Sequence, residues 1–435
     1  MSTDVAAETR LVLSDDQARA LATKYGTPLY VIDEHHLRNR VRAYIKAFRA
    51  AHDKTELTYA SKANSTLAVV AIVASEGCPI DVASEGELRA ALRAGIPAKN
   101  THLHGNAKSA QEIKAAFDLG VGQIIVDNFE EIDAVAGTKG NCPDLLLRLA
   151  PGVSPKTHAK ISTGQDDTKF GFNIADGSAE RALTRCLELG LPVVGFHCHV
   201  GSQLLDPEAQ IGGGRALATF AAEMAKKQGF MARVLNLGGG VGIRYDDQSQ
   251  AIDPRQYCLS VVQGVKEGLA GSGLDPVIVQ EPGRWIIGES CVTLYSVNNV
   301  KTVPTKDGTR TYVSVDGGMA DNPRPAMYGS PYPVRWISAD ESAPGAPMKV
   351  RIAGRHCESD TLFDDKTLPS NVKKGDVLQV LCTGAYNSSM ASNYNRYPRP
   401  TTVLLRPDGS DVVVQRPETW DEMYARESVP EGLGR

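Results

Sequence analysis

Several features are absent from this sequence of 435 residues, and each absence excludes a class of protein. No apolar run approaches the ~20 residues that a membrane-spanning helix needs. The N-terminal residues MSTDVAAETRLVL contain neither a basic nor an apolar region, so they predict no secretion signal. An excess of positive charge is also missing, because 47 Lys and Arg residues face 51 Asp and Glu residues. The resulting formal charge of −4 excludes a polybasic nucleic-acid binder of the usual kind.

Paired cysteine motifs are absent as well. The chain has eight cysteines, and no two of them form a CxxC pair. A chain of this length needs no disulfides to stabilise its core, so we expect reduced thiols and a cytoplasmic protein. Most of these cysteines are expected to be small buried hydrophobic residues. Cys357 is the exception and is considered below.

The length and composition predict two globular domains. One hydrophobic core rarely serves more than ~250 residues, and this chain is much longer. Hydrophobic residues make up 42% and charged residues 23% of the chain, which excludes wholesale disorder.

The first two thirds of the chain alternate short apolar runs with helical patterns. Such alternation predicts a parallel sheet. The expected strands are 57–61, 79–82, 101–103, 123–126, 145–149, 193–198, 234–237 and 277–280. Helical patterns between them include 67–76, 85–94, 110–119 and 216–228. Eight strands over ~225 residues favour a closed (β/α)8 barrel at residues 36–288, with an open doubly wound sheet as the alternative.

The pattern of predicted elements changes after Glu281, where strand-like runs follow one another without long helical patterns. These runs are 292–297, 312–315, 334–337, 349–353, 377–382, 402–405 and 411–415. We therefore expect an all-β domain, a sandwich or barrel, built from residues 289–435. The strand-like run at 28–32 is a candidate for the same sheet, so residues 1–35 are assigned to this domain too.

Polar residues gather at the predicted carboxyl ends of the barrel strands, where parallel barrels carry their chemistry. They are Lys62, Asp81, His104, Asp127, Arg148, His199, Gly238–Gly240, Glu281 and Arg284. A lysine in a desolvated pocket becomes a nucleophilic amine, although Lys62 alone could also be a solvated lysine at a strand end. The glycine turn can present N–H groups to a phosphate, or can be a tight turn with no ligand.

Glu281 and Arg284 suit a heteroaromatic nitrogen and an anion, with a surface ion pair as the alternative. The pairs His102-x-His104 and His197-x-His199 lack further ligands at zinc-like spacing, so no metal is predicted. One of these histidines could stack on a planar cofactor, or both pairs could be core histidines.

Eight motifs in order carry a family resemblance. They are YASK62AN, D81VASEGE, GFHCH199VGS202, G238GG, E281PGR284, D321NPR324PAMY328, C357E358S and G384AY386. Together they resemble the fold-type III pyridoxal-phosphate-dependent decarboxylases with an alanine racemase-like barrel, and most closely the diaminopimelate decarboxylases. The resemblance extends from about Tyr25 to Pro400.

The resemblance implies pyridoxal 5'-phosphate as the cofactor and assigns roles to residues of the barrel. It implies that Lys62 binds the cofactor covalently, that His199 stacks on its ring, and that Glu281 contacts the ring nitrogen. The other cofactor-binding residues that it implies are Asp81, Arg148, Ser202, Gly238, Gly239, Gly240, Gly283, Arg284 and Tyr386.

The resemblance also implies that the β domain contributes to substrate binding and to a homodimer with shared active sites. Arg284, Arg324, Tyr328 and Tyr386 are the implied substrate contacts, and Glu358 receives the distal amino group. Cys357 is the implied proton donor or relay and, with Glu358, reaches the site of the partner subunit. Asp360 directly follows Ser359, one residue earlier than in the family pattern. The segment 162–171 resembles a loop that closes over the site.

The implied reaction is decarboxylation of meso-2,6-diaminopimelate to L-lysine through an external aldimine, the last step of lysine biosynthesis. The ring withdraws electrons from the carbanion while Glu281 keeps its nitrogen protonated. Three alternatives remain at this point. They are a decarboxylase of another basic amino acid such as ornithine, D-lysine or a polyamine precursor, an inactive paralogue, and an amino-acid racemase. Neither a nucleic acid nor a membrane is expected as a partner.

Overall fold

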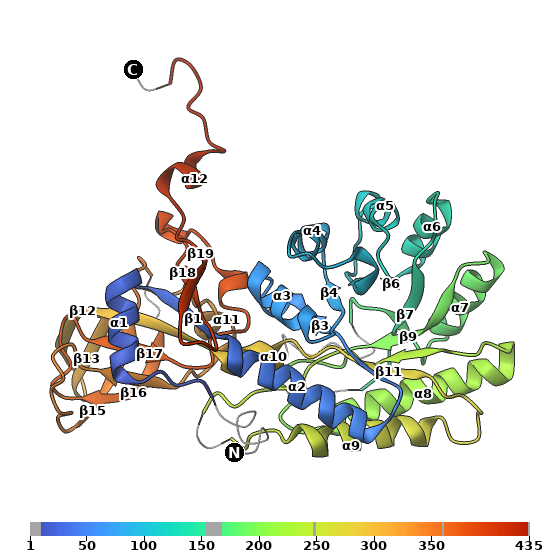
Figure 1. The fold of residues 1–435 in the computed structure, drawn as a ribbon, viewed down its shortest axis with the longest axis horizontal. Helices are drawn as coiled ribbons and strands as arrows, with labels where there is room; N and C mark the ends of the chain where they lie inside the picture. Colours follow the sequence, from blue (N-terminus) through green and yellow to red (C-terminus); the bar gives the residue numbers. More distant parts are fainter. Residues whose placement is uncertain (1–9, 154–167, 247–248, 359–360, 434–435) are drawn as a thin grey trace. The chain divides into compact units, whose positions relative to one another are not determined.

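The computed structural model describes residues 10–153, 168–246, 249–358 and 361–433 (Figure 1). Two compact units divide the chain. One contains His35–Glu289, and the other combines Arg10–Glu34 with Ser290–Arg435. Within the described residues, no helix is both long enough and apolar enough to cross a membrane.

The first unit is built around a parallel sheet that confirms the predicted barrel. Its strand order is β2-β11-β10-β9-β7-β6-β5-β4-β3, with β8 paired to β7. The strands are β2 (Thr55–Leu57), β3 (Tyr59–Ala60), β4 (Ile80–Val82), β5 (Thr101–Leu103), β6 (Gln123–Val126), β7 (Asp144–Ala150), β8 (Phe172–Asn173), β9 (Val193–Cys198), β10 (Val234–Asn236) and β11 (Val277–Gln280). Ile125, Leu146 and Val194 form a buried cluster from three of these strands.

The barrel closes through one interrupted strand. The two ends of the sheet order, β2 and β3, are separated in the chain by Thr58 alone. β2 pairs with β11, and the Thr58 N–H donates to the Gln280 carbonyl at 2.9 Å. On the other side, β3 pairs with β4, and the Tyr59 N–H donates to the Pro79 carbonyl at 2.9 Å. The predicted strand 57–61 therefore joins the first and last strands of the barrel, which excludes the open sheet.

Helices follow most of the barrel strands and lie outside them (Figure 1). They are α2 (Glu34–Ala51), α3 (Leu67–Ser75), α4 (Glu85–Arg93), α5 (Ala110–Leu119), α6 (Phe129–Gly137), α7 (Ser178–Glu188), α8 (Glu208–Gln228), α9 (Pro254–Gly268) and the short α10 (Arg284–Ile287). Side-chain caps fix several starts: Ser84, Ser109 and Asn128 each accept the N–H three residues ahead. These caps begin helices right after the strand ends and so fix the turns that carry the polar residues.

The second unit contains a mostly antiparallel sheet. Its strands are β1 (Leu29–Asp33), β12 (Cys291–Thr305), β13 (Gly308–Val315), β14 (Val334–Ile337), β15 (Pro347–Ala353), β16 (Phe363–Pro369), β17 (Val377–Val380), β18 (Thr401–Leu405) and β19 (Asp411–Gln415). The N-terminal strand β1 lies between β12, to which it is antiparallel, and β18, to which it is parallel. The expectation that the run at 28–32 joins this sheet is confirmed.

Four elements of this unit were not predicted. Strand β16 has the sequence FDDKTLP, in which three consecutive charged residues obscure the strand pattern. Helix α1 (Asp15–Tyr25) starts with a capping box formed by Ser14 and Gln17, and it contacts β12, β14 and β17. The unit also contains the five-residue helices α11 (Arg324–Tyr328) and α12 (Trp420–Tyr424). The sheet is thus accompanied by helices that a purely β pattern did not predict.

Candidate active site

Polar side chains of the first unit occupy the carboxyl ends of consecutive barrel strands. Lys62 lies in the turn of 3-10 helix that follows β3, and Asp81 lies in β4. The Lys62 Nζ atom is 3.9 Å from Asp81 Oδ2. Asp81 is completely buried, and this burial raises the pKa of its carboxyl group to about 6. The structure thus places a partly exposed lysine amine beside a buried acid, as the positions of the two strand ends predict.

His199 is held at the end of β9 by the glycine turn that follows β10. Its Nδ1 accepts the N–H of Gly239 at 3.2 Å, so Nδ1 is unprotonated and a neutral ring carries its proton on Nε2. Burial, with the nearby cations of Lys62 and Arg148, lowers the pKa of His199 well below its usual value. A neutral, oriented imidazole is suited to stack on a planar ring.

The glycine turn is packed too closely for side chains. Gly238 has a φ of +66°, and a Cβ at this position would lie 2.5 Å from the Cys198 carbonyl oxygen. A Cβ at Gly239 would lie 2.2 Å from the Glu281 carbonyl oxygen. The fold therefore requires glycine at 238 for its backbone conformation and at both positions for lack of space.

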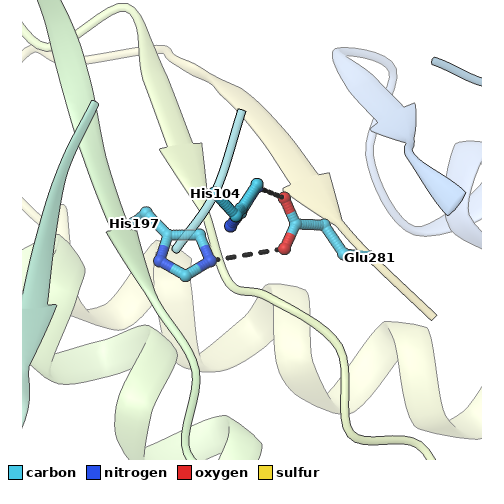
Figure 2. A group of neighbouring side chains, drawn as sticks. All are labelled: His104, His197 and Glu281. Carbon is cyan, nitrogen blue, oxygen red and sulfur yellow. Dashed lines mark hydrogen bonds and ion pairs between the residues drawn. The ribbon is translucent and has the colours of Figure 1, made fainter. Parts of the chain in front are cut away.

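Glu281 follows β11 and is surrounded by three side chains from other strands. Figure 2 shows His104 and His197 beside its carboxylate, with Nε2-to-oxygen distances of 3.1 and 3.3 Å. The Nδ2 of Asn236 donates to Glu281 Oε1 at 2.6 Å. Burial alone would raise the pKa of this carboxyl group, but the two histidines lower it well below its usual value. Glu281 is therefore an ionised carboxylate inside the barrel.

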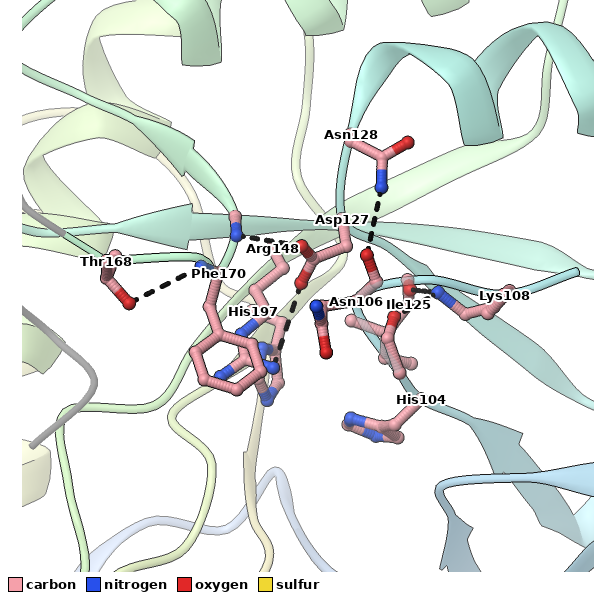
Figure 3. Close-up of polar contacts among 12 residues, drawn as sticks. His104, Asn106, Lys108, Ile125, Asp127, Asn128, Arg148, Thr168, Phe170 and His197 are labelled. Atoms are coloured by element: carbon pink, nitrogen blue, oxygen red, sulfur yellow. Dashed lines mark hydrogen bonds and ion pairs between the residues drawn. The ribbon is translucent and has the colours of Figure 1, made fainter. Parts of the chain in front are cut away.

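Arg148 on β7 and Asp127 after β6 form a second buried pair (Figure 3). Arg148 Nη1 lies 3.8 Å from Asp127 Oδ1, and the N–H of Gly171 donates to Asp127 Oδ2 at 3.1 Å. The Phe170 ring stacks over the Arg148 guanidinium, 4.2 Å from it. These contacts fix the orientation of Arg148. Most of the predicted closing loop, residues 162–167, lies outside the described residues.

Arg284 and Ser202 are brought together, with a third residue that was not predicted. The Arg284 guanidinium donates to Ser202 Oγ at 3.0 Å and to the Tyr245 hydroxyl at 2.8 Å. Arg284 is buried, and it begins helix α10 directly after Gly283. A Cβ at Gly283 would lie 2.8 Å from the Ala60 carbonyl oxygen, so this turn also requires glycine.

In the second unit, Arg324 lies between two tyrosines. Its guanidinium carbon is 5.0 Å from the ring centre of Tyr328 and 5.3 Å from that of Tyr386. Arg324 is buried, and its Nε has no hydrogen-bond acceptor within the described part of the chain. Tyr386 has a φ of +62°, a rare conformation for a tyrosine. The three residues form a cationic, aromatic group suited to an anion.

Cys357 and Glu358 are exposed in this chain and are held by the 3-10 turn Tyr394–Arg396. The Cys357 N–H donates to Asn395 Oδ1 at 2.9 Å, and the Tyr394 hydroxyl donates to Glu358 Oε1. Asn395 has a φ of +52°, which asparagine tolerates better than most residues. Ser359 and Asp360, where the sequence departs from the family pattern, lie outside the described residues.

Sequence reasoning missed the contacts of His104, His197, Asn236, Tyr245 and Tyr394. The histidines were considered as i, i+2 pairs on one strand, whereas the structure pairs His104 with His197 across strands, their ring centres 5.1 Å apart. Asn236 did carry a signal, because it directly precedes the glycine turn at a strand end.

Comparisons with known proteins place this geometry in a family. The family described as "Pyridoxal-dependent decarboxylase, pyridoxal binding domain" matches residues 35–288. Diaminopimelate decarboxylase of Bacillus subtilis is 42% identical over 409 residues, covering 93% of this chain and 92% of that protein. A crystal structure of diaminopimelate decarboxylase from M. jannaschii with L-lysine has a TM-score of 0.89 at 33% identity, covering 98% and 99% of the two chains. A crystal structure of diaminopimelate decarboxylase from Helicobacter pylori with L-lysine has a TM-score of 0.83 at 31% sequence identity. The match covers 93% of this chain and 98% of that chain. The chain belongs to the family of pyridoxal-dependent decarboxylases that includes the diaminopimelate decarboxylases.

Proposed function

We propose that this protein removes one carboxyl group of meso-2,6-diaminopimelate to give L-lysine and CO2, the last step of lysine biosynthesis. The relatives described above carry this activity in their names, and two of their structures hold L-lysine. The observation that carries the chemistry is Glu281, a buried carboxylate held ionised at the same barrel end as Lys62.

The residues at this end fit pyridoxal phosphate. Asp81 is buried, and neither of its carboxylate oxygens has a hydrogen-bond donor within the described residues. The turn Gly238–Gly240 and the Gly283-Arg284 segment combine positions without side chains with a buried guanidinium, which suits a phosphate, while the N–H groups of Gly238 and Gly239 donate to Asn236 and His199. Lys62 would hold the cofactor, and Ser202, Arg284 and Tyr386 would join the glycines around its phosphate. Asp81 and Arg148 complete the set of cofactor-binding residues in this proposal.

When bound, the cofactor accepts electron density from Cα as CO2 leaves. The residues of this chain orient the cofactor and hold the proton on its ring nitrogen while CO2 leaves. Glu281 would meet the ring nitrogen of the cofactor and stabilise a proton on it, because a carboxylate favours a neighbouring cation. His199, a neutral imidazole, would stack on the ring. Burial of His197, Asp81 and Arg148 around the site excludes water and strengthens these electrostatic contacts.

Substrate selection is assigned to the β unit. Arg324 has a buried guanidinium with unused hydrogen-bonding capacity, which suits the distal carboxylate of diaminopimelate. Glu358 is a carboxylate suited to the distal amino group, and Arg284, Tyr328 and Tyr386 complete the contacts. A substrate such as ornithine has the distal amine but no distal carboxylate, so it leaves Arg324 unpaired.

Cys357 is the proposed acid that returns a proton to Cα. With Glu358 it is exposed in the single chain, which supports a role across a subunit boundary rather than within one chain. We therefore propose a homodimer in which the β unit supplies dimer contacts and these two residues reach the partner's site. The eight free cysteines are consistent with the proposed cytoplasmic location.

A substrate panel tests the proposal. Holoenzyme is supplied separately with meso-diaminopimelate, L-lysine, D-lysine and L-ornithine, and CO2 release and amine products are measured. We expect the largest kcat/KM with meso-diaminopimelate and equal amounts of CO2 and L-lysine. The variant Arg324→Met should lose this preference, and faster release from ornithine or lysine in the natural protein would contradict the assignment.

A further inference from the structure

The carboxylate of Glu281 is contacted on both of its oxygens by histidines from different strands. His104 follows β5, and its Nε2 is 3.1 Å from Oε1, while His197 lies in β9 with its Nε2 3.3 Å from Oε2 (Figure 2). The side chains that contact this carboxylate thus belong to three strand regions: His104 follows β5, His197 lies in β9, and Asn236 lies in β10. Both histidines are buried, with 5% and 1% of their surface exposed.

We propose that His104 and His197 are positioning residues for the decarboxylation: together they fix the rotation of the Glu281 carboxylate so that it faces and keeps protonated the ring nitrogen of the cofactor. This inference rests on the proposed cofactor site. It adds to that site two residues that touch Glu281 rather than the reacting atoms.

Fixing both oxygens matters because a carboxylate held by one oxygen can still rotate about its terminal bond. Asn236 and His104 contact Oε1, and His197 contacts Oε2, so rotation in either direction breaks a contact. The two imidazoles also pack edge to face at an interplanar angle of 77°, so each limits the movement of the other.

Burial favours a neutral His197, which donates a hydrogen bond to Glu281 Oε2. Burial lowers the pKa of His197 to about 4, so at neutral pH it supports Glu281 through its N–H and not as a cation. Asp81 also faces His104, with Oδ1 at 3.7 Å from Nε2, and Arg148 lies on the intervening strand β7. A neutral donor at His197 leaves the negative charge of Glu281 available to the ring nitrogen, whereas a full cation would compete for it.

A bound metal ion is the alternative use of the same cluster. The ligand atoms of His104, His197 and Glu281 all lie within 4.8 Å of one another, which a divalent cation could bridge. A metal at this point would occupy the oxygens that the ring nitrogen needs. A metal ion and the ring nitrogen therefore cannot both contact the Glu281 oxygens. A chelator should change the protonation of the ring nitrogen only if a metal ion is bound.

The test uses pyridoxal phosphate labelled with 15N in the ring, bound to the holoenzyme and followed by 15N NMR. The chemical shift reports directly whether the ring nitrogen is protonated. His→Asn variants at 104 and 197 are too short to reach Glu281, whereas His→Gln variants place an N–H at a similar distance. We expect a protonated nitrogen in the natural protein and in the Gln variants. In the Asn variants we expect a largely unprotonated nitrogen and cofactor binding weakened about tenfold.

His102→Asn provides the matched control, because His102 is a buried histidine on β5 that makes no hydrogen bond or ion pair with the Glu281 carboxylate within the described structure, although it lies in the electrostatic field of that carboxylate. This control should give the signal of the natural protein. Asn variants at 104 and 197 that fold and retain a protonated nitrogen would overturn the inference. So would an unprotonated ring nitrogen in the natural protein that becomes protonated only after treatment with EDTA, which would assign the cluster to a metal. Failure of the proposed cofactor site differs from both, since the natural protein would then bind no cofactor, and failure of the substrate assignment appears only in the substrate panel.

Discussion

Lys108 Nζ lies 2.7 Å from Glu131 Oε2, and both side chains are almost completely buried behind the strand ends that carry the site. The ammonium also donates to the carbonyls of Gly105 and Ile125, each at 2.6 Å. Figure 3 shows this lysine between the turn after His104 and strand β6. The pair therefore fixes the turn that places His104 beside Glu281.

We predict that Lys108→Met lowers the free energy of unfolding by ~3–5 kcal/mol, because it leaves the Glu131 carboxylate buried without its cation. Urea denaturation at fixed cofactor concentration measures this change. Lys114→Met is the control, since Lys114 and its partner Asp118 on α5 are both more than half exposed, and such pairs contribute ~0–1 kcal/mol. Equal losses in the two variants would contradict the structural role of the buried pair.

Substitution in the glycine turn should affect the cofactor more than the fold. In Gly239→Ala the new methyl group meets the Glu281 carbonyl oxygen, so the backbone on one side of the site must move. We expect cofactor binding, measured by fluorescence titration, to weaken by about tenfold or more, in line with the effect of a small displacement at a binding site. Gly137→Ala, at a glycine with open space around it, should bind the cofactor like the natural protein. Normal binding by the Gly239 variant would show that this turn is not part of the site.

Tyr394 is predicted to influence substrate binding through Glu358. Its hydroxyl donates to the Glu358 carboxylate, and His356 stacks on its ring, with centres 5.9 Å apart. Tyr394→Phe retains the ring and removes the hydrogen bond, so we expect KM for diaminopimelate to rise about twofold to tenfold with little change in kcat. Tyr424→Phe, at an exposed tyrosine that stacks with Arg396, serves as the control. An unchanged KM would mean that Tyr394 does not orient Glu358 during binding.

We predict that the free energy of unfolding of the β unit depends on pH because of the buried side chain of Asp321. Its carboxylate accepts hydrogen bonds from the Tyr295 hydroxyl and the Gly318 N–H, yet burial raises its pKa from 3.8 to about 7. The folded state therefore binds this proton more tightly than the unfolded state. The contribution of Asp321 to stability is complete below pH ~4 and is lost as the pH rises through about 7.

The variant Asp321→Asn removes that titration. Relative to it, the natural protein should lose a few kcal/mol between about pH 5 and pH 8, at ~1.4 kcal/mol per pKa unit. Denaturation curves of both proteins at the two pH values measure the difference. Asp118→Asn, at an exposed position, should show no such difference. Parallel pH profiles for Asp321→Asn and the natural protein would refute the prediction.

The barrel strands could be predicted because buried parallel strands read as short apolar runs bounded by helix caps. Strand β16 could not, since its stability comes from pairing with β15 rather than from its own charged sequence. The predicted site residues Lys62 and Asp81 meet because adjacent strands of a parallel barrel end at one edge. The contacts of His104 and His197 with Glu281 depend on which strands face one another across the barrel interior. The local sequence pattern does not encode this arrangement. The same holds for Tyr245, which follows a loop and approaches Arg284 only in the folded chain.

Chemical trapping at Lys62 tests the central claim most directly. Borohydride reduces an imine between a lysine and pyridoxal phosphate to a stable amine, and peptide mass spectrometry then locates the label. The account predicts a phosphopyridoxyl group on the peptide that carries Lys62 and none after Lys62→Ala. A label on another lysine, or no label on the natural protein, would contradict it.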